Sequence, residues 1–223
     1  MTGMRRPILL LGCLVACLFA PISPASAADN VPGAFDYYVL VLSWMPSYCK
    51  SEGAERDDGQ CEAGRRRGFL LHGLWPQYDK GWPENCPTQG RPWVPDDVIA
   101  EMRDIMPSKS LMIHEYRVHG TCSGLDPVQY FGVARELYER VNIPAVFAAK
   151  DTGLDTPEAV RNAILEVNPW LKPEMIAVAC RRQNLLDVRI CFGRDLFPRA
   201  CGANETRKRL CPADKIGVPP VAP

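Results

Sequence analysis

The sequence predicts an α+β fold, with a mostly antiparallel central sheet and helices packed on one side of it. Three observations carry this prediction. Strand-like runs of β-branched and aromatic residues occur at both ends of the chain, and helix-like amphipathic segments are grouped in the middle. This order is typical of α+β domains. An even set of cysteines behind an apolar N-terminal segment further predicts a fold stabilised by disulfides.

Residues 1–27 predict a secretory signal peptide. Two arginines precede an apolar run over residues 7–22, and residues 25–27 read Ala-Ser-Ala, the small-x-small pattern of a cleavage site. We therefore expect a secreted or periplasmic protein whose residues 28–223 form a single domain, with no later stretch long enough to span a membrane. Cys17 lies in a context that resembles a bacterial lipidation site. The apolar run continues past it, so a lipid anchor is the less favoured alternative.

The net charge of the chain argues against a protein that binds nucleic acid through a large excess of positive charge. The sequence has 26 basic and 26 acidic residues, and removal of the signal peptide takes away two arginines and no acid, which leaves about −2. A chain without excess positive charge does not hold nucleic acid by bulk electrostatics. An enzyme that contacts a few phosphates and releases its product remains compatible with this charge.

Eight of the ten cysteines lie outside the signal peptide, and they predict four disulfides in an oxidising compartment. No two of them form a Cys-x-x-Cys pair, which argues against a zinc ribbon or a thioredoxin-like redox motif. Spacing alone leaves about 105 pairings open.

Four segments predict strands. Residues 36–45, DYYVLVLSWM, are too apolar for an exposed strand and predict a central one. Residues 68–75, GFLLHGLW, predict a second strand that ends near His72. Residues 175–181 and 185–192 predict a late hairpin with a short turn.

Four segments between these strands predict helices: residues 94–106, 112–119, 126–141 and 156–167. Gly120 is expected to end the second of them as a helix cap. The third begins with Asp126 as N-cap and a proline in the first turn, and the fourth repeats this device with Thr156. The last seven residues, GVPPVAP, predict an irregular end.

All three histidines lie in two short segments of similar character, FLLHGLWPQ and LMIHEYRVHGTCSG. On a helix Glu115 and His119 share a face, whereas His114 lies about 100° round from Glu115. A carboxylate beside an imidazole favours the imidazolium and orients the ring, as acid/base catalysis requires. The glycines that follow His72 and His119 are expected to leave room for a ligand beside each ring.

The same residues invite a metal-site interpretation, which their spacing disfavours. Zinc-binding helices use His-Glu-x-x-His, with both ligands on one face. Here the spacing is His-Glu-x-x-x-His, which turns the rings of His114 and His119 about 140° apart on a helix. We therefore expect no metal site. A purely structural role for both histidines at a helix end is the simpler alternative, and the likeness of the two segments weakens it.

These two segments resemble the active-site segments of the ribonuclease T2 family. That family commonly has His-Gly-Leu-Trp-Pro, found here as residues 72–76, and His-Glu-aromatic-x-Lys-His-Gly-Thr-Cys, which corresponds to residues 114–122. The likeness covers essentially all of residues 36–212. It implies a ribonuclease T2-like fold and a low-specificity endoribonuclease that cleaves single-stranded RNA without a metal ion or other cofactor.

The resemblance also implies a two-step reaction. The 2′-hydroxyl of the RNA attacks the adjacent phosphorus to give a 2′,3′-cyclic phosphate, which water then opens. DNA lacks this hydroxyl and is not a substrate. His119 is implied as the base and His72 as the acid, with His114 binding the phosphate and Glu115 beside its non-bridging oxygens. The candidates for substrate binding are Trp75, Gln77, Tyr78 and Arg117.

One position departs from the family pattern. Where the family has a lysine directly before the second catalytic histidine, this chain has Val118, so a cation that steadies the phosphorane is missing. Arg117 is adjacent but points about 100° away on a helix. Loss of one preorganised electrostatic contact typically costs on the order of 10²- to 10³-fold in rate. The alternatives are a slow enzyme, a catalytically weakened T2-like protein that binds RNA or another partner, and a metal-dependent phosphodiesterase.

The resemblance further implies a disulfide pairing: Cys86 with Cys122, Cys180 with Cys211, Cys191 with Cys201, and Cys49 with Cys61. The first pair ties the loop after His72 to the segment that carries His119. We expect a monomer. Asn204-Glu205-Thr206 is a glycosylation sequon, which has meaning only in a eukaryotic producer.

Overall fold

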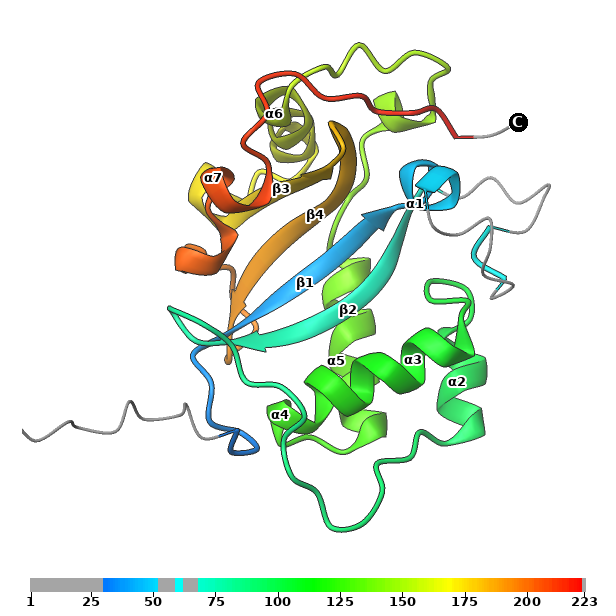
Figure 1. Cartoon of the computed structure of the whole chain (residues 1–223), viewed down its shortest axis with the longest axis vertical. Coiled ribbons are helices and arrows are strands. Elements are labelled where there is room, and N and C mark those ends of the chain that lie inside the picture. Colours follow the sequence, from blue (N-terminus) through cyan, green and yellow to red (C-terminus); the bar gives the residue numbers. More distant parts are fainter. Residues whose placement is uncertain (1–29, 52–58, 62–67, 222–223) are drawn as a thin grey trace, which may run out of the picture.

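The structure is a computed structural model that describes residues 30–51, 59–61 and 68–221 (Figure 1). The predicted signal peptide, including Cys17, lies outside the described residues. Among the residues that are described, no helix is both long and apolar enough to cross a membrane.

Four antiparallel strands form one sheet in the order β2-β1-β4-β3: β1 (Tyr37–Trp44), β2 (Phe69–Gln77), β3 (Ile176–Arg181) and β4 (Asn184–Gly193). The predicted strands are confirmed, and so is the α+β class with its antiparallel sheet. The predicted end of the second strand near His72 is wrong. The strand continues because Trp75 and Gln77 still pair with Val39 and Tyr37 of β1.

Short helices connect and cover the strands: α1 (Met45–Ser51), α2 (Asp96–Met102), α3 (Lys109–Glu115), η2 (Tyr116–Gly120), α4 (Thr121–Ser123), α5 (Pro127–Glu139), η3 (Ala145–Ala148), α6 (Pro157–Val167), η4 (Pro173–Met175), η5 (Ala203–Glu205) and α7 (Arg207–Leu210). Both predicted N-caps are confirmed. Asp126 forms a capping box with Gln129, and the Thr156 side chain accepts from Ala159 N–H. The predicted helix over residues 94–106 is shorter, since α2 ends at Met102.

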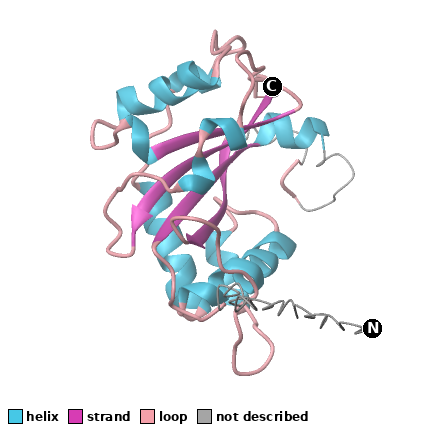
Figure 2. Ribbon diagram, turned by 60° about the vertical axis from the view of Figure 1, so that its left-hand side comes forward, coloured by secondary structure: helices cyan, strands magenta, loops and turns pink. Residues whose placement is uncertain are grey.

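The two faces of the sheet differ in what covers them. One face, with Leu40 and Leu42 of β1, packs against α2, α3, α5 and α6 to form the main core. In Figures 1 and 2 α5 runs along the back of β1 and β2, and α6 lies beside β3. The opposite face, with Val39 and Val41 of β1, carries a smaller buried cluster that Trp75 adjoins. The candidate site lies on this second face.

The hairpin of β3 and β4 places β4 next to β1. Its two turn residues, Arg182 and Gln183, have φ values of 48° and 60°. Positive φ at both central residues is the requirement of a type I′ turn, whose twist matches that of the strands it joins. β4 therefore enters the sheet in a fixed register with β1, in which Val41 pairs with Arg189.

All four disulfides implied by the resemblance are present: Cys49–Cys61, Cys86–Cys122, Cys180–Cys211 and Cys191–Cys201. Two of them border the candidate site. Cys86–Cys122 joins the loop after β2 to α4, and Cys191–Cys201 joins β4 to the loop that follows it. These bonds restrict the chain on both sides of the second face of the sheet.

Candidate active site

A β-bulge in β2 decides where His72 points. The register shifts between Val41, which pairs with Gly73, and Leu42, which pairs with Leu71, so His72 is the extra residue on β2. Bulges redirect side chains and are common beside active sites. Without the shift His72 would pair with Leu42 and face the main core. With it Leu71 enters the core at 1% exposure, and the His72 side chain remains 33% exposed.

Both ring nitrogens of His72 have a protein partner. Nδ1 lies 3.1 Å from the Ser43 hydroxyl on β1, and Nε2 lies 3.4 Å from Glu115 Oε1 at the end of α3. An imidazolium donates from both nitrogens, whereas a neutral imidazole donates from only one. Two potential acceptors therefore suit the protonated ring.

The Glu115 carboxylate is buried against the sheet, with 1% of the residue exposed. Its Oε2 accepts a 2.7 Å hydrogen bond from Trp75 Nε1. A Cβ at Gly73 would lie 2.0 Å from Glu115 Oε2 and 2.8 Å from Trp75 Nε1. Gly73 is therefore required for this approach. The space beside it, predicted to admit a ligand, is filled by the carboxylate and the indole.

The segment that carries the second histidine pair is not one α-helix. α3 continues into the π-helical turn η2, in which Thr121 N–H donates to Tyr116 C=O, and then into α4. The chain leaves the helix at Gly124, which has a φ of 77°. The prediction that residues 112–119 are helical is confirmed, but the helix is α-helical only as far as Glu115, and the predicted cap at Gly120 is wrong. π-turns contain one more residue than α-turns and occur frequently at functional sites.

Gly120 neither caps the helix nor leaves room for a ligand, although the sequence predicts both. A Cβ there would lie 2.4 Å from Tyr116 Cδ2, so glycine admits the ring of a residue in the same helix and not a ligand. The wider turn also changes the direction of His119. In a regular α-helix, residues five apart are separated by roughly 140° around the axis. In an i→i+5 turn this angle is smaller, so the two residues lie nearer to one face. His114 and His119 are accordingly near enough for their charges to interact.

His119 lies against the indole of Trp75, with ring centroids 5.1 Å apart and planes inclined by 32°. The His72 ring is 5.6 Å from the same indole in an edge-on arrangement, so Trp75 contacts both imidazoles. Nδ1 of His119 is buried and has no hydrogen-bond partner in the described part of the chain. Because an imidazolium needs an acceptor at each nitrogen, this environment favours the neutral ring.

The pKa values of the two imidazoles are shifted in opposite directions. Burial alone would lower the pKa of His72, but the charge and hydrogen bonding of Glu115 outweigh it, and the pKa is raised. Burial lowers the pKa of His119, and Glu115 opposes this only in part. Burial would raise the pKa of Glu115, but its pairing with His72 lowers it. The arrangement therefore favours a protonated His72 beside a neutral His119.

A cavity of about 370 Å³ opens beside His119. Trp75 and Gln77, both candidates for substrate binding, line it. The other lining residues were not predicted from the sequence to bind substrate: Trp82, Arg189, Asn204, Glu205, Arg209 and Leu210. Indole faces next to hydrogen-bonding groups are suited to a stacked nucleobase.

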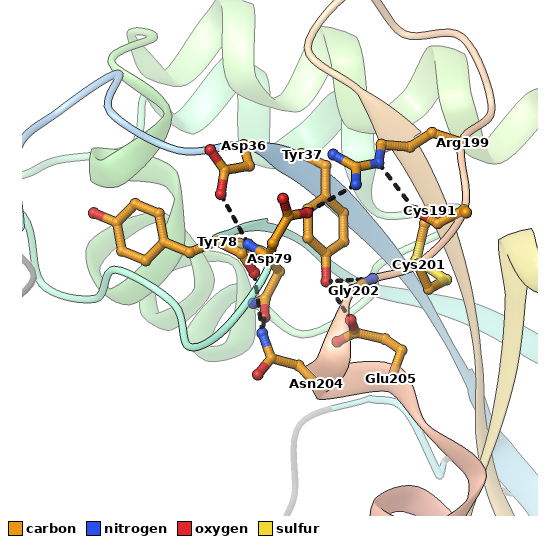
Figure 3. Close-up of polar contacts among 12 residues, drawn as sticks. Asp36, Tyr37, Tyr78, Asp79, Cys191, Arg199, Cys201, Gly202, Asn204 and Glu205 are labelled. Atoms are coloured by element: carbon orange, nitrogen blue, oxygen red, sulfur yellow. Dashed lines mark hydrogen bonds and ion pairs between the residues drawn. A yellow bond between two sulfur atoms is a disulfide. The ribbon is translucent and has the colours of Figure 1, made fainter.

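The far wall of the cavity comes from the loop that the Cys191–Cys201 disulfide attaches to β4. In Figure 3 the Tyr37 hydroxyl, at the start of β1, meets both Gly202 and Glu205 of this loop. The hydroxyl donates to the Glu205 carboxylate and accepts from Gly202 N–H at 3.2 Å. Burial raises the pKa of the Glu205 carboxyl. Two polar contacts between elements distant in sequence thus fix this wall.

Asn204 fastens the same loop to the end of β2. Its Nδ2 donates to Gln77 Oε1 at 3.0 Å and to Gly81 C=O at 2.8 Å, and its Oδ1 accepts from Gly81 N–H. The residue is 5% exposed. The sequon at Asn204 is therefore inaccessible to a glycosylating enzyme in the folded chain, and Gln77 acts here as a support for the loop.

Besides His72 and Glu115, three more predicted site residues do not line the cavity. His114 is exposed at the end of α3. Arg117 Nε donates to Pro92 C=O at 3.3 Å, on the loop that follows β2. The Tyr78 ring packs against the main core, and Figure 3 shows it pointing away from Asn204.

The described residues offer no ready metal site. No group of three or more His, Cys, Asp or Glu side chains among them is arranged to hold an ion. Glu115 is engaged by His72 and Trp75.

The residues of this site lie within a region that matches a known family. The profile of the Ribonuclease T2 family matches residues 35–201, which include β1, β2, both histidine segments and β4. The chain belongs to the ribonuclease T2 family. Membership supports endoribonuclease as its enzyme class.

Proteins similar to this chain occur in several organisms. Ribonuclease of Aeromonas hydrophila is 40% identical over 141 residues, which are 63% of this chain and 61% of that protein. The match thus spans less than two thirds of that relative. Ribonuclease DdI of Dictyostelium discoideum is 27% identical over 209 residues, 82% of this chain and 88% of that protein. The solved structure of an RNase-related protein from Calystegia sepium shares the fold, with a TM-score of 0.65, 23% identity, and coverage of 83% and 97% of the two chains.

Within this ribonuclease T2 site, Val118 provides no charge. Its carbonyl accepts from Asn85 N–H at 2.8 Å, which holds the loop after β2 against η2. A cation does line the cavity from another element, because Arg189 of β4 reaches it. One feature of the sequence could have indicated this residue. Asp187 and Arg189 are charged positions two apart in an otherwise apolar strand pattern, LLDVRICF.

Proposed function

We propose that this protein is a low-specificity endoribonuclease that cleaves single-stranded RNA by metal-independent transesterification through a 2′,3′-cyclic phosphate. One observation supports this most directly. A buried carboxylate, Glu115, lies beside two imidazoles whose pKa values are shifted in opposite directions. An acid and a base of the same residue type, separated by their environments, are what such a reaction requires.

In the first step the neutral His119 takes the proton of the 2′-hydroxyl. The 2′-oxygen forms a bond to phosphorus, the bond from phosphorus to the 5′-oxygen breaks, and His72 gives its proton to that oxygen. In the second step His72 takes a proton from water, which opens the ring, and His119 returns its proton to the 2′-oxygen. Each imidazole ends the cycle in the protonation state in which it began.

Glu115 acts in this scheme chiefly through His72. Its carboxylate keeps that imidazole protonated until the leaving oxygen needs the proton. The 3.4 Å separation from Nε2 is long for a charge-assisted hydrogen bond, which leaves the proton available for transfer. The family resemblance additionally assigns Glu115 to the non-bridging oxygens and His114 to the phosphate. The exposed position of His114 is compatible with contact to a polymer that lies across the surface.

The cavity beside His119 supports binding of a base. Stacking on Trp75 or Trp82 contributes about 1 to 3 kcal/mol per base and tolerates any base, which agrees with low specificity. The amide oxygen of Gln77 already accepts a hydrogen bond, which limits its use in base discrimination. Tyr78 and Arg117 remain candidates for contacts outside this cavity.

We further propose that residues 1–27 are removed as a signal peptide and that residues 28–223 form one secreted or periplasmic, monomeric domain. The four disulfides support an oxidising compartment. N-terminal sequencing of the exported protein should give Ala28 as its first residue. A lipid-modified Cys17 at the N-terminus would instead show that the protein is anchored.

Val118 supports one competing function, a catalytically weakened T2-like protein that binds RNA or another partner. A Val118→Lys variant separates the two. If the parent is inactive and this substitution produces cleavage, the defect lies in the missing cation. No activity in either protein would favour the binding role.

The first test incubates purified, oxidised residues 28–223 with RNA and with DNA in excess EDTA, and identifies the products by mass. We expect cleavage of RNA only, with ends that carry 2′,3′-cyclic phosphates, because the nucleophile is the 2′-hydroxyl. Cleavage that requires added metal would refute the mechanism. Cleavage of DNA would refute the role of the 2′-hydroxyl.

A further inference from the structure

We propose that Arg189 supplies, at the scissile phosphate, the positive charge that the family's lysine supplies from the position of Val118. The inference rests on the proposed function, because it places a phosphate between His72 and His119. It explains how a member that lacks the lysine retains a cation in the site, contributed by the sheet and not by the helix.

The register of the sheet brings Arg189 to the site. Gly73 pairs with Val41, and Val41 pairs on its other side with Arg189, so the three form one row across β2, β1 and β4 and face the same way. In this row the Glu115 carboxylate and the Trp75 indole lie close to Gly73. The guanidinium reaches back over Trp75, with Cζ 5.0 Å from the ring centroid. His119 lies 5.1 Å from the same indole and lines the same cavity.

The Arg189 side chain is 16% exposed and oriented by a neighbour. Its Nε donates to Asp187 Oδ1 at 2.9 Å, and Asp187 is itself buried. In the part of the chain that the structure describes, no protein acceptor takes a hydrogen bond from its terminal Nη atoms. A guanidinium fork with one nitrogen anchored and two free is suited to bidentate contact with a phosphate.

Other nearby cations are less suited to this role. Arg117, next to Val118, donates to a loop carbonyl and does not line the cavity. Arg199 is paired with Asp79. Arg209 lines the cavity but is exposed on α7. The charge of Arg189 also reaches the catalytic pair. Burial and the charge of Arg189 both lower the pKa of His72, but Glu115 raises it more strongly, so the net shift is upward.

The test compares Arg189→Met and Arg189→Lys with the parent in cleavage of a dinucleoside phosphate, each at its own pH optimum. We expect kcat/KM to fall about 10²- to 10³-fold in Arg189→Met, as for other preorganised charge contacts. Arg189→Lys should recover part of the loss, because lysine keeps the charge but not the fork. The matched control is Arg140→Met. Arg140 also stacks on aromatic rings, 5.5 Å from the centroid of Trp170, but lies outside the cavity, and it should retain parental activity.

A second comparison uses the position of the missing lysine. Val118→Lys should raise the activity of Arg189→Met by more than about tenfold and that of the parent by less. The reason is that the introduced lysine and Arg189 would both stabilise the charge on the same phosphate. Equal effects in the two backgrounds would show independent roles. Arg189→Met leaves Asp187 buried without its partner, which is destabilising. The double variant Asp187→Asn with Arg189→Met removes this problem and should show the same loss of kcat/KM with a native near-ultraviolet circular dichroism spectrum.

Two outcomes would overturn the inference. The first is that the parent cleaves RNA and the kcat/KM of the Arg189→Met variant is within about threefold of the parental value. If the parent does not cleave RNA, the proposed function fails separately, and binding of inorganic phosphate decides. The chain has three histidines, so the ring signals of His119 can be followed by NMR. A phosphate-induced shift that is lost in Arg189→Met and kept in Arg140→Met supports the inference, and equal shifts in all proteins refute it.

Discussion

Replacement of His119 by alanine should lower RNA cleavage by about 10²- to 10⁴-fold, the usual contribution of a general acid or base. The His72→Ala variant should lose activity to a similar extent, because the 2′-oxygen and the 5′-oxygen each need their own proton carrier. The two losses should not add in the double variant, since the residues act in one proton-transfer cycle. Initial rates on single-stranded RNA, measured at the parental pH optimum, provide the check.

His114→Ala is the internal control for this experiment. Its ring is exposed and does not line the cavity, so the loss should be smaller than for the other two histidines. All variants should keep the four disulfides and a native circular dichroism spectrum. Near-parental activity in either His72→Ala or His119→Ala, in a folded protein, would refute the assignment of acid and base.

The Glu115→Gln variant should lose about 10²- to 10³-fold in rate and shift the pH profile toward acid. In the parent the active form has neutral His119 and protonated His72. The ordinary pKa of histidine is about 6.5. As the pH rises, activity should increase where His119 loses its proton, which happens below that value because its pKa is lowered. Activity should decrease where His72 loses its proton, which happens above that value because its pKa is raised. Glu115 raises both pKa values, so its neutralisation lowers both, and both limbs of the bell move to lower pH.

The measurement is kcat/KM as a function of pH for the parent and the variant. Glutamine retains an oxygen that can accept from Trp75, so the packing around Gly73 is preserved. The matched control is Glu205→Gln, another buried carboxylate on the same face of the sheet, which accepts a hydrogen bond from Tyr37 and, within the described residues, none from an imidazole. It should leave the limb assigned to His72 unmoved. A parental rate still rising above pH 9 would contradict the pairing of two imidazoles.

Several features followed from local rules and were predictable from single segments. The apolar run DYYVLVLSWM became the central strand β1, which is 0–4% exposed at Tyr37 and Tyr38. Asp126 and Thr156 became N-caps because a side-chain oxygen can satisfy free N–H groups only two or three residues ahead. The likeness of two histidine segments to one family was also contained in the order of the residues, and the family match agrees with it.

The details of the site did not follow from local rules. The bulge at His72 depends on how β2 aligns with β1. The π-turn before His119 and the position of Gly120 against Tyr116 depend on how the helix packs, and they replaced an expected α-helix with a glycine cap. The place of Arg189 in the site could not be predicted, because two strand registers, of β2 with β1 and of β1 with β4, align it with Gly73 through Val41.

The sequence by itself determined the fold class, the two histidine segments that match the family and the cysteine set of this protein, since periodicity, capping and motif are properties of residues close together in the chain. Only the tertiary structure decided which charges surround the imidazoles. Burial lowers the pKa of both rings, but Glu115 at the end of α3 outweighs it at His72 and only partly offsets it at His119, so the two pKa values diverge. The distances of the two rings from Glu115 are set by strand register and burial, which arise only when the sheet closes against the helices.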